Sequence, residues 1–161
     1  ICCSYFLPGP LLRQKLAQAL KRNVRVRVIL TGISDVPFAK SAERYLYRWM
    51  LNRGIEIYEY QSNVLHAKVS TIDDRWTTIG SYNLNEVSAL ASLEANLDVR
   101  DRDFAISTRL LLDQIIQKDC RSIKLEEIKH RYGLFSRLGQ RLSYYLIHAI
   151  LWLFTFYFRQ E

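Results

Sequence analysis

The sequence has few of the residues that mark a secreted or zinc-binding protein. Its three cysteines, Cys2, Cys3 and Cys120, form an odd set without the spacing of a zinc site. The first ten residues, ICCSYFLPGP, contain neither a basic segment nor a long apolar run, so nothing there resembles a signal peptide. We therefore expect reduced thiols in a cytosolic setting, buried as small hydrophobic side chains without a catalytic role.

Acidic residues are outnumbered by basic ones. The 161 residues contain 23 Lys and Arg against 16 Asp and Glu, which gives a formal charge of +7. This balance favours negatively charged partners, and both nucleic acid and anionic lipid surfaces qualify. The length suits one domain or one lobe of a larger protein. Because the chain opens on Ile1 and not on methionine, we expect a fragment.

Strand-like and helix-like segments alternate along the first three quarters of the chain. Such alternation implies an α/β fold, with a sheet of mixed parallel and antiparallel strands flanked by helices. Helices are predicted at 11–22, 38–54 and 103–119, strands at 24–32, 55–60 and 93–101, and a hairpin within 64–83.

The hairpin gathers polar residues on one face. If the strand 64–73 turns back through a symmetric two-residue closure, opposed residue numbers sum to about 149. His66 then faces Asn83, and Lys68 faces Ser81. Because side chains alternate with a period of two, all four share one face, and together they suit the oxygens of a phosphodiester. This prediction depends on the register, since a shift by one residue removes the coincidence.

The residue types on this face predict phosphoryl transfer without a metal or other cofactor. His66 is suited to attack phosphorus or to protonate a leaving oxygen, and Lys68 supplies a fixed positive charge. No carboxylate cluster with metal-ligand spacing accompanies them. Gly80 within the second strand indicates the close approach of a ligand or of backbone, and we expect a phosphate there.

Three acidic residues near the hairpin have different expected roles. Asp73 is an odd number of residues from His66, so a regular strand points it away from the shared face, and we expect it to stabilise the turn. Glu94 is the candidate for orienting a catalytic imidazole. Asp35 lies on a loop at a strand's end, where a ligand contact and a turn-capping role are both open.

The hairpin also carries a long gapped motif, His66-x-Lys68-x4-Asp73-x6-Gly80-Ser81-x-Asn83. This motif resembles the HKD motif of the phospholipase D superfamily, with every spacing matched. The flanking segments resemble bacterial cardiolipin synthases over roughly residues 4 to 122. These segments are SYFLPGPLL, ILTGISDVP, GIEIYEYQ and ASLEANLDVRD.

The resemblance implies a phospholipase D-like lobe that transfers a phosphatidyl group through a phosphohistidine intermediate. With phosphatidylglycerol as the acceptor, the product is cardiolipin. It implies phospholipid substrates at the bacterial inner membrane, with a cytoplasm-facing site and no nucleic acid. In relatives with two motifs, the C-terminal histidine more often serves as the general acid/base and the N-terminal one as the nucleophile. By its position, His66 is the general acid/base. The implied catalytic residues are His66, Lys68, Asp73 and Glu94, and the implied phosphate-binding residues are Lys68, Ser81 and Asn83.

The chain has one such motif, because neither His130 nor His148 begins a second His-x-Lys. This chemistry requires two imidazoles, so the partner is a missing N-terminal HKD lobe or a second copy of the chain, and Ile1 favours the first. Asn85 departs from the family, which usually has Asp there. We expect acceptor handling or local capping to differ at this position.

The last segment, 123–161, is a basic and aromatic tail, set apart from the lobe 1–122. Its apolar run 142–158 spans about 26 Å as a helix, slightly less than a bilayer core. We expect a helix that lies in the membrane interface, the alternative being a helix packed on a catalytic lobe. Besides a phosphatidyltransferase, a phosphodiesterase or nuclease and a catalytically inactive lipid-binding lobe remain open functions.

Overall fold

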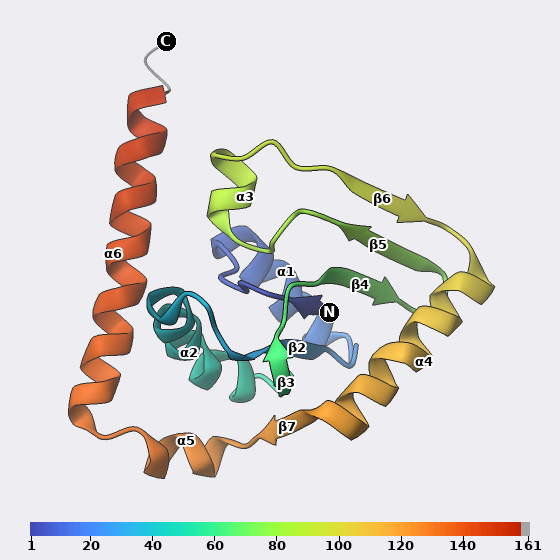
Figure 1. The fold of residues 1–161 in the computed structure, drawn as a ribbon, viewed down its shortest axis with the longest axis horizontal. Coiled ribbons are helices and arrows are strands. Elements are labelled where there is room, and N and C mark those ends of the chain that lie inside the picture. The colour runs from blue at the N-terminus through green and yellow to red at the C-terminus, as the bar shows by residue number, and fades with distance from the viewer. Residues whose placement is uncertain (159–161) are drawn as a thin grey trace.

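The fold is a seven-stranded mixed sheet with helices on both faces (Figure 1). The computed structural model describes residues 1–158, without the side chains of Lys129, Arg131 and 154–158. The sheet order is β6-β5-β4-β1-β2-β3-β7. This confirms the α/β class expected from the sequence. The elements are β1 (Cys2–Cys3), α1 (Pro10–Lys21), β2 (Arg27–Ile33), α2 (Pro37–Leu51), β3 (Glu56–Val64), β4 (Lys68–Ile72), β5 (Trp76–Gly80), α3 (Glu86–Leu90), β6 (Asn96–Val99), α4 (Arg102–Asp119), β7 (Cys120–Ile123), α5 (Leu125–Arg131) and α6 (Leu134–Phe158).

The short strand β1 joins two halves of the sheet. It pairs in parallel with β2, with Cys2 opposite Ile29, and antiparallel with β4, with Cys3 opposite Lys68. On one side β2 and β3 continue in parallel, and on the other β4, β5 and β6 form an antiparallel meander. Two residues are too few to show a periodic pattern, so the sequence does not predict this strand.

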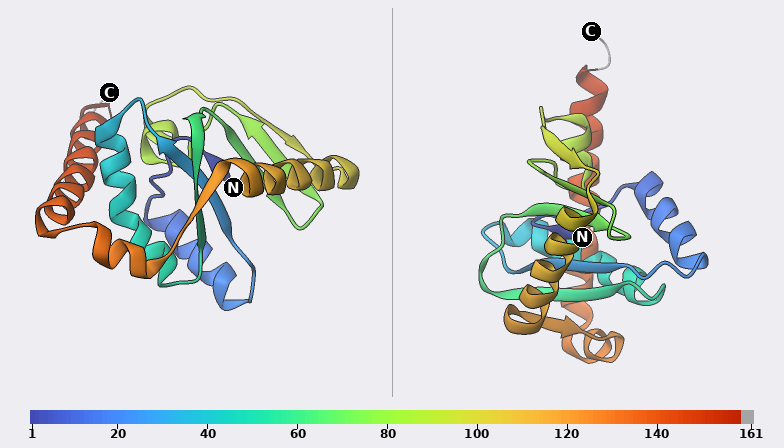
Figure 2. Two further views of the ribbon diagram at one scale, coloured as in Figure 1. Left: turned by 60° about the horizontal axis from the view of Figure 1, so that its bottom comes forward. Right: turned by 90° about the vertical axis from the view of Figure 1, so that its right-hand side faces the viewer.

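Each face of the sheet has its own core (Figure 2). On one face α1 and α2 cover Val28, Leu30 and Ile57, and Phe6 and Leu46 fill the space between them. On the other face Ile29 packs with Cys2 and with Leu112 of α4. Since side chains alternate along a strand, successive residues of β2 serve the two cores in turn. β2 is therefore buried on both sides.

The ends of the first two helices agree with the sequence prediction. Asn23 has a φ of 62° and Gly54 a φ of 85°, both in the left-handed region that ends a helix. Both helices begin with proline in the first turn, Pro10 and Pro37. The third long helix, α4, begins one residue before its predicted start, because Asp101 is its N-cap and accepts a hydrogen bond from Phe104 N at 2.8 Å.

A buried ionic cluster ties α2 to β3. Lys40 Nζ lies 2.5 Å from Glu43 Oε1 and 3.2 Å from Glu59 Oε1, and all three side chains are at most 4% exposed. Burial raises the pKa of Glu43, which also accepts a hydrogen bond from Phe6 N at 3.2 Å. Because a buried charge without a partner is costly, the cluster holds α2 and the segment after β1 in one arrangement.

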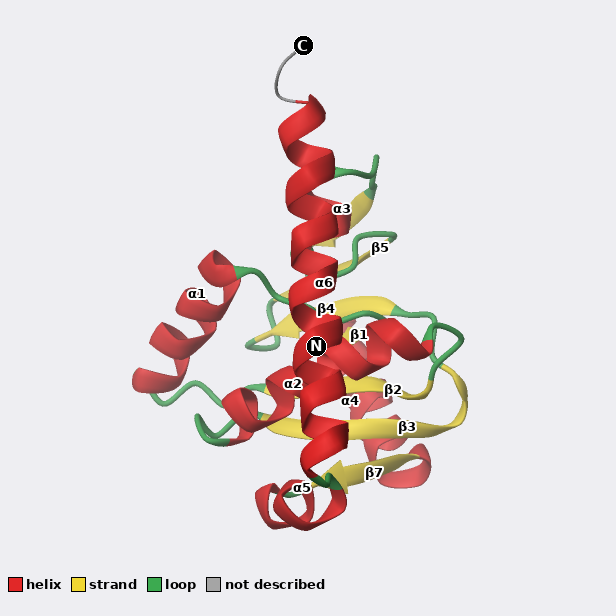
Figure 3. Cartoon of the chain, turned by 90° about the vertical axis from the view of Figure 1, so that its left-hand side faces the viewer, coloured by secondary structure: helices red, strands yellow, loops and turns green. Residues whose placement is uncertain are grey.

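The tail is helical, as expected, and α6 packs along α2 (Figure 3). Tyr144 of α6 belongs to the main core, with its ring 4.8 Å from that of Tyr45. Among the residues that the structure describes, no helix is both long and apolar enough to cross a bilayer. Residues 159–161, the last of the predicted tail, lie outside the described part of the chain.

Candidate active site

The hairpin register differs by one residue from the sequence prediction. Val69 lies opposite Ile79 and Ile72 opposite Trp76, so opposed residue numbers sum to 148. The predicted sum of 149 was wrong, because the chain turns through three residues. Asp73 and Asp74 in this turn have φ values of 52° and 51°. The extra turn residue shifts the second strand, and the predicted opposition of His66 to Asn83 and of Lys68 to Ser81 does not occur.

His66 and Lys68 nevertheless meet, as the sequence predicts. His66 is exposed on the connection between β3 and β4, and Lys68 is the first residue of β4. Lys68 Nζ lies 2.9 Å from His66 Nε2. A charged lysine has no acceptor, so Nε2 accepts this bond and a neutral ring carries its proton on Nδ1. The imidazole nitrogen thus lies against a fixed positive charge.

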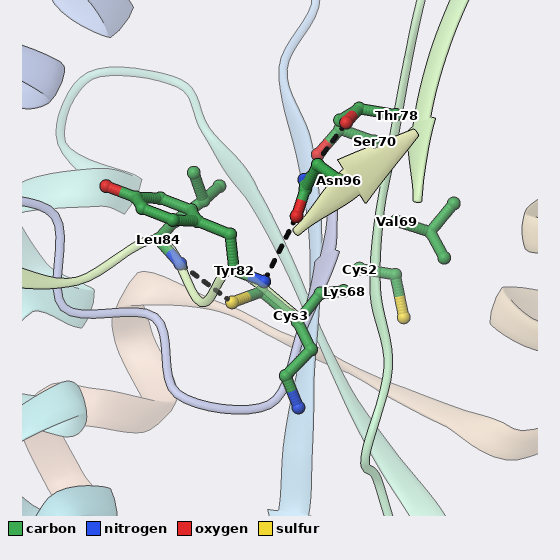
Figure 4. A pocket seen from close by; sticks show the side chains of 9 residues that line it. All are labelled: Cys2, Cys3, Lys68, Val69, Ser70, Thr78, Tyr82, Leu84 and Asn96. Atoms are coloured by element: carbon green, nitrogen blue, oxygen red, sulfur yellow. Dashed lines mark hydrogen bonds between the residues drawn. The ribbon is translucent and has the colours of Figure 1, made fainter. Parts of the chain in front are cut away.

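Asn83 reaches the same region by way of β1. Its Oδ1 accepts a hydrogen bond from the Cys3 thiol at 3.8 Å, and Cys3 is paired with Lys68 in the sheet. Lys68 and Cys3 also line one small cavity, together with Tyr82, Leu84 and Asn96 (Figure 4). Asn83 is therefore linked to Lys68 indirectly, through Cys3 of a strand that the sequence does not predict.

Ser81 lies beyond the end of β5 and is bonded to the segment before β6. Its N–H donates to Ala95 O and its Oγ accepts from Ala95 N, both at 3.0 Å. Ser81 and Ser88 also hydrogen-bond with Glu94 and lower the pKa of that carboxyl, with a smaller contribution from the charge of Lys68. Glu94 is thus placed beside Ser81 and within the electrostatic reach of Lys68. Its hydrogen bonds go to the two serines.

Gly80 is required by a neighbouring strand. A Cβ at this position would lie 2.2 Å from Ala95 O and 2.2 Å from Asn96 Oδ1. The Asn96 side chain accepts from Tyr82 N at 3.2 Å and donates to Thr78 Oγ1 at 3.0 Å, which fixes it against β5. The close approach inferred from this glycine is real, but backbone and an amide occupy the space that we expected for a phosphate.

Asp73 lies in the turn, as expected from its odd separation from His66. It is five residues beyond Lys68 along β4, a distance of about 17 Å in a regular strand. The next residue, Asp74, accepts a hydrogen bond from Arg109 Nε of α4 at 2.6 Å. The turn is therefore anchored on a helix at the end of the hairpin remote from the His66–Lys68 pair.

Asp35 is the site residue that sequence reasoning left undecided. Ile33 of β2 pairs with Val64 of β3. Asp35 lies two positions after Ile33, and His66 lies two positions after Val64. Tyr5 Oη donates to Asp35 Oδ1 at 2.6 Å, which lowers the pKa of Asp35, and a smaller electrostatic contribution comes from His66. Its place at the carboxyl end of a parallel strand was the available signal.

Asn85, which stands where the resemblance to cardiolipin synthases leads us to expect Asp, caps α3. Its Oδ1 accepts from Ser88 N at 2.9 Å, and its Nδ2 donates to Tyr5 O at 3.1 Å. An aspartate retains the first bond and lacks the second donor. Local capping therefore does involve this residue, and the amide adds a link to the segment that carries Tyr5.

Burial makes the cysteines poor nucleophiles. It raises the pKa of Cys2 to about 12 and that of Cys3 to about 11, and the pKa of the half-buried Cys120 also rises to about 11. Since the thiolate is the reactive form, these groups remain thiols at neutral pH. All three cysteines are free.

Comparison with known proteins decides the family. Residues 1–119 match the model described as cardiolipin synthase, PLD-like domain. The chain belongs to this phospholipase D-like family. The cardiolipin synthase B of Salmonella typhi is 40% identical over 123 residues, or 76% of the chain and 30% of that relative. The chain thus spans about 30% of the length of the curated relative that it matches.

Solved structures share the phospholipase D-like fold. The phosphatidylserine synthase of Haemophilus influenzae Rd KW20 has a TM-score of 0.69 at 18% identity, covering 96% of this chain and 40% of its own. The phospholipase D family member Nuc of Salmonella typhimurium has a TM-score of 0.62 at 22% identity, covering 75% and 78%. Both matches agree with the lobe expected from the HKD motif.

Proposed function

We propose that this chain is one catalytic lobe of a phosphatidyltransferase that makes cardiolipin or a similar phospholipid. The observation that carries the proposal is the His66–Lys68 pair, 2.9 Å apart and next to Asn83 through Cys3, in a chain of the cardiolipin synthase family. Lys68 and the Asn83 amide suit the oxygens of a phosphodiester, and charge developing on them is stabilised by fixed donors.

The proposed reaction has two displacements. One histidine attacks the phosphorus of a phospholipid, forms a P–N bond and breaks the P–O bond to the head-group alcohol. That alcohol leaves with a proton from a second histidine. The hydroxyl of phosphatidylglycerol then attacks the same phosphorus, gives its proton to the second histidine, and the P–N bond breaks. By its position, that of the C-terminal motif in relatives with two motifs, His66 takes the acid/base role.

A second HKD lobe completes this site in our proposal. The chain supplies one His-x-Lys, whereas the two displacements require two imidazoles. An N-terminal lobe of a longer polypeptide or a second copy of the chain can provide the other. Without either, the lobe is inactive. Glu94 is proposed to orient an imidazole, that of His66 or that of the second lobe, and Asp73 to hold the turn of the hairpin.

The alternative is a phosphodiesterase or nuclease of the same superfamily. The formal charge of +7 suits nucleic acid as well as anionic lipid. The 40% identity to a cardiolipin synthase B favours lipid. We accordingly propose action on phospholipids at the inner face of the bacterial cell membrane.

The decisive experiment incubates the full-length protein with phosphatidylglycerol vesicles and follows cardiolipin by mass spectrometry. His66→Ala should abolish the product, whereas His130→Ala, an exposed histidine outside the site, should leave it unchanged. Cleavage of DNA without a lipid product would establish the alternative. Unchanged lipid turnover in His66→Ala would overturn the mechanism.

A further inference from the structure

Helix α6 has two faces, of which the lobe covers one. Towards α2, Gln140, Ser143, Tyr144 and Leu151 are buried, each at most 9% exposed. Tyr144 packs on the ring of Tyr45 in α2 at 4.8 Å between centroids. This face fixes the helix to α2, while the C-terminal turns of α6 project beyond the rest of the lobe (Figures 1 and 3).

The opposite face is apolar and exposed. Nine large hydrophobic residues on it are 41% to 89% exposed. At 3.6 residues per turn they fall within about 160° of the helix circumference, on the side away from the buried face. An apolar surface of this extent marks an interaction site. We call these residues the α6 stripe: Leu134, Phe135, Leu138, Leu142, Tyr145, Leu146, Ile150, Trp152 and Leu153.

Positive charge borders the α6 stripe. Arg137 and Arg141 are exposed on successive turns, and the Arg141 guanidinium lies 5.7 Å from the centre of the Tyr145 ring. The sequence of α6 contains no Asp or Glu. Tyrosine and tryptophan favour the head-group region of a bilayer, and arginines beside them are attracted to anionic lipids.

We propose that the α6 stripe is a docking surface for an anionic lipid bilayer, on which the helix lies in the plane of the interface. From Leu134 to Leu153 the stripe is about 30 Å long, and an in-plane helix inserts its apolar side to a depth of only about 5–10 Å. The charge of the bordering arginines selects a lipid surface over an apolar protein partner. In-plane insertion also agrees with the finding that no described helix can cross a bilayer.

Docking through α6 bears on the site because α6 contacts the segment after the motif. His148 Nδ1 lies 2.8 Å from Glu86 Oε2, and Glu86 is the first residue of α3. The preceding residue, Asn85, is bonded to Tyr5 O. A helix held on the bilayer therefore fixes α3 and the Tyr5 segment relative to the lipid. The inference itself rests on α6 alone and is independent of the proposed activity.

The test is flotation of the full chain with vesicles. Binding to phosphatidylcholine vesicles that contain phosphatidylglycerol should fall at least about tenfold in the double variant Leu138→Gln, Leu142→Gln, because their insertion supplies the apolar energy. Leu97→Gln on β6 is the matched control, since Leu97 and Leu142 are both 66% exposed. Its binding should equal that of the unmodified chain.

Two further measurements keep the outcome decisive if the double variant unfolds. The substitutions Arg137→Gln and Arg141→Gln should each weaken vesicle binding about fivefold. This effect should occur only with vesicles that contain anionic lipid. Brominated lipids should quench Trp152 fluorescence, a signal that Trp152→Phe removes. Equal binding of all variants would overturn the proposal, as would concentration-dependent self-association that Leu138→Gln abolishes, which would make the stripe a contact between chains.

Discussion

The ammonium of Lys68 donates to Nε2 of His66 across 2.9 Å, from the first residue of a strand to the exposed connection before it. Lys68 is half-buried and paired with Cys3 of β1, whereas His66 is exposed. The strand thus fixes the charge, and the histidine remains accessible to a substrate. This division suits a site where the positive charge must be in place before the phosphate arrives.

Lys68→Met should lower phosphatidyl transfer by about 10²–10³-fold, because it removes the cation beside the reacting phosphoryl oxygens. Lys68→Arg keeps the charge but spreads it over a planar fork, so we expect an intermediate loss. The measurement is kcat/KM on phosphatidylglycerol vesicles, with thermal denaturation to confirm folding. Activity of Lys68→Met within a few-fold of the unmodified protein would contradict this role.

Gly80→Ala should destabilise the protein by about 1–3 kcal/mol, because the new Cβ would meet Ala95 O and Asn96 Oδ1 and displace β6 from β5. Urea unfolding measures the change. Gly139→Ala is the matched control: it lies within α6, where an added Cβ meets nothing within 4 Å, and should gain about 0.5–1 kcal/mol. Equal effects at the two glycines would argue against the observed packing of β6.

Asn85→Asp and Asn85→Ala should separate the two bonds of this side chain. Aspartate keeps an acceptor for Ser88 N and loses the donor to Tyr5 O, for which we expect a loss of about 0.5–1.5 kcal/mol. Alanine also removes the cap, which adds about 1 kcal/mol. Denaturant unfolding of the three proteins gives both differences. An alanine variant as stable as the aspartate variant would show that the cap contributes nothing.

Tyr5→Phe should raise the pKa of Asp35 towards that of an ordinary aspartate, because the Tyr5 hydroxyl is the main cause of its lowering. A lowered pKa stabilises the folded state above the pKa of the unfolded chain and ceases to do so as pH falls through the folded pKa. The stability difference between Tyr5→Phe and the unmodified protein should therefore shrink on acidification. Carbon NMR titration measures the pKa directly.

Tyr58→Phe serves as the control for that titration. The Tyr58 hydroxyl bonds Glu56 Oε2 at 2.7 Å and contributes, after Arg25, to the lowered pKa of Glu56. This variant should raise the pKa of Glu56 and leave that of Asp35 unchanged. A shift of Asp35 in both variants would point to a general rearrangement instead of a lost hydrogen bond.

The cysteines should resist alkylation at neutral pH. The pKa of Cys120 is raised to about 11, so its thiolate fraction and its rate with iodoacetamide should rise about tenfold per pH unit up to that value. Cys2 and Cys3, both buried, should react only after unfolding. Mass spectrometry of timed reactions at several pH values reads out each site. Rapid modification of the native protein at pH 7 would contradict the burial.

Much of the fold was predictable because its signals are local. The apolar spacing of α2 and the β-branched residues of β2 report on neighbours a few positions away, and the ends at Asn23 and Gly54 depend on single residues. The meeting of His66 and Lys68 was also local, since the two residues are only two positions apart in the chain. These predictions were confirmed.

Other features depended on contacts between distant segments. The register of the hairpin followed from two turn residues in the left-handed conformation, Asp73 and Asp74. Aspartate can adopt this conformation but does not require it, so the sequence does not predict it. Gly80 correctly indicated a close approach, but which atoms approach depends on where β6 lies. The link from Asn83 to Lys68 passes through Cys3, about eighty residues earlier in the chain.

By itself the sequence determined the α/β class, the HKD-like motif and the pairing of His66 with Lys68, because periodicity and spacing are properties of neighbouring residues. The tertiary structure alone decided that Cys3 of β1 links Asn83 to Lys68, that Asp35 and His66 follow neighbouring strands at equivalent positions, and that one face of α6 is packed and the other exposed. Each of these results depends on which distant segments bury apolar surface against one another. That choice is made only when the whole sheet and its helices pack together.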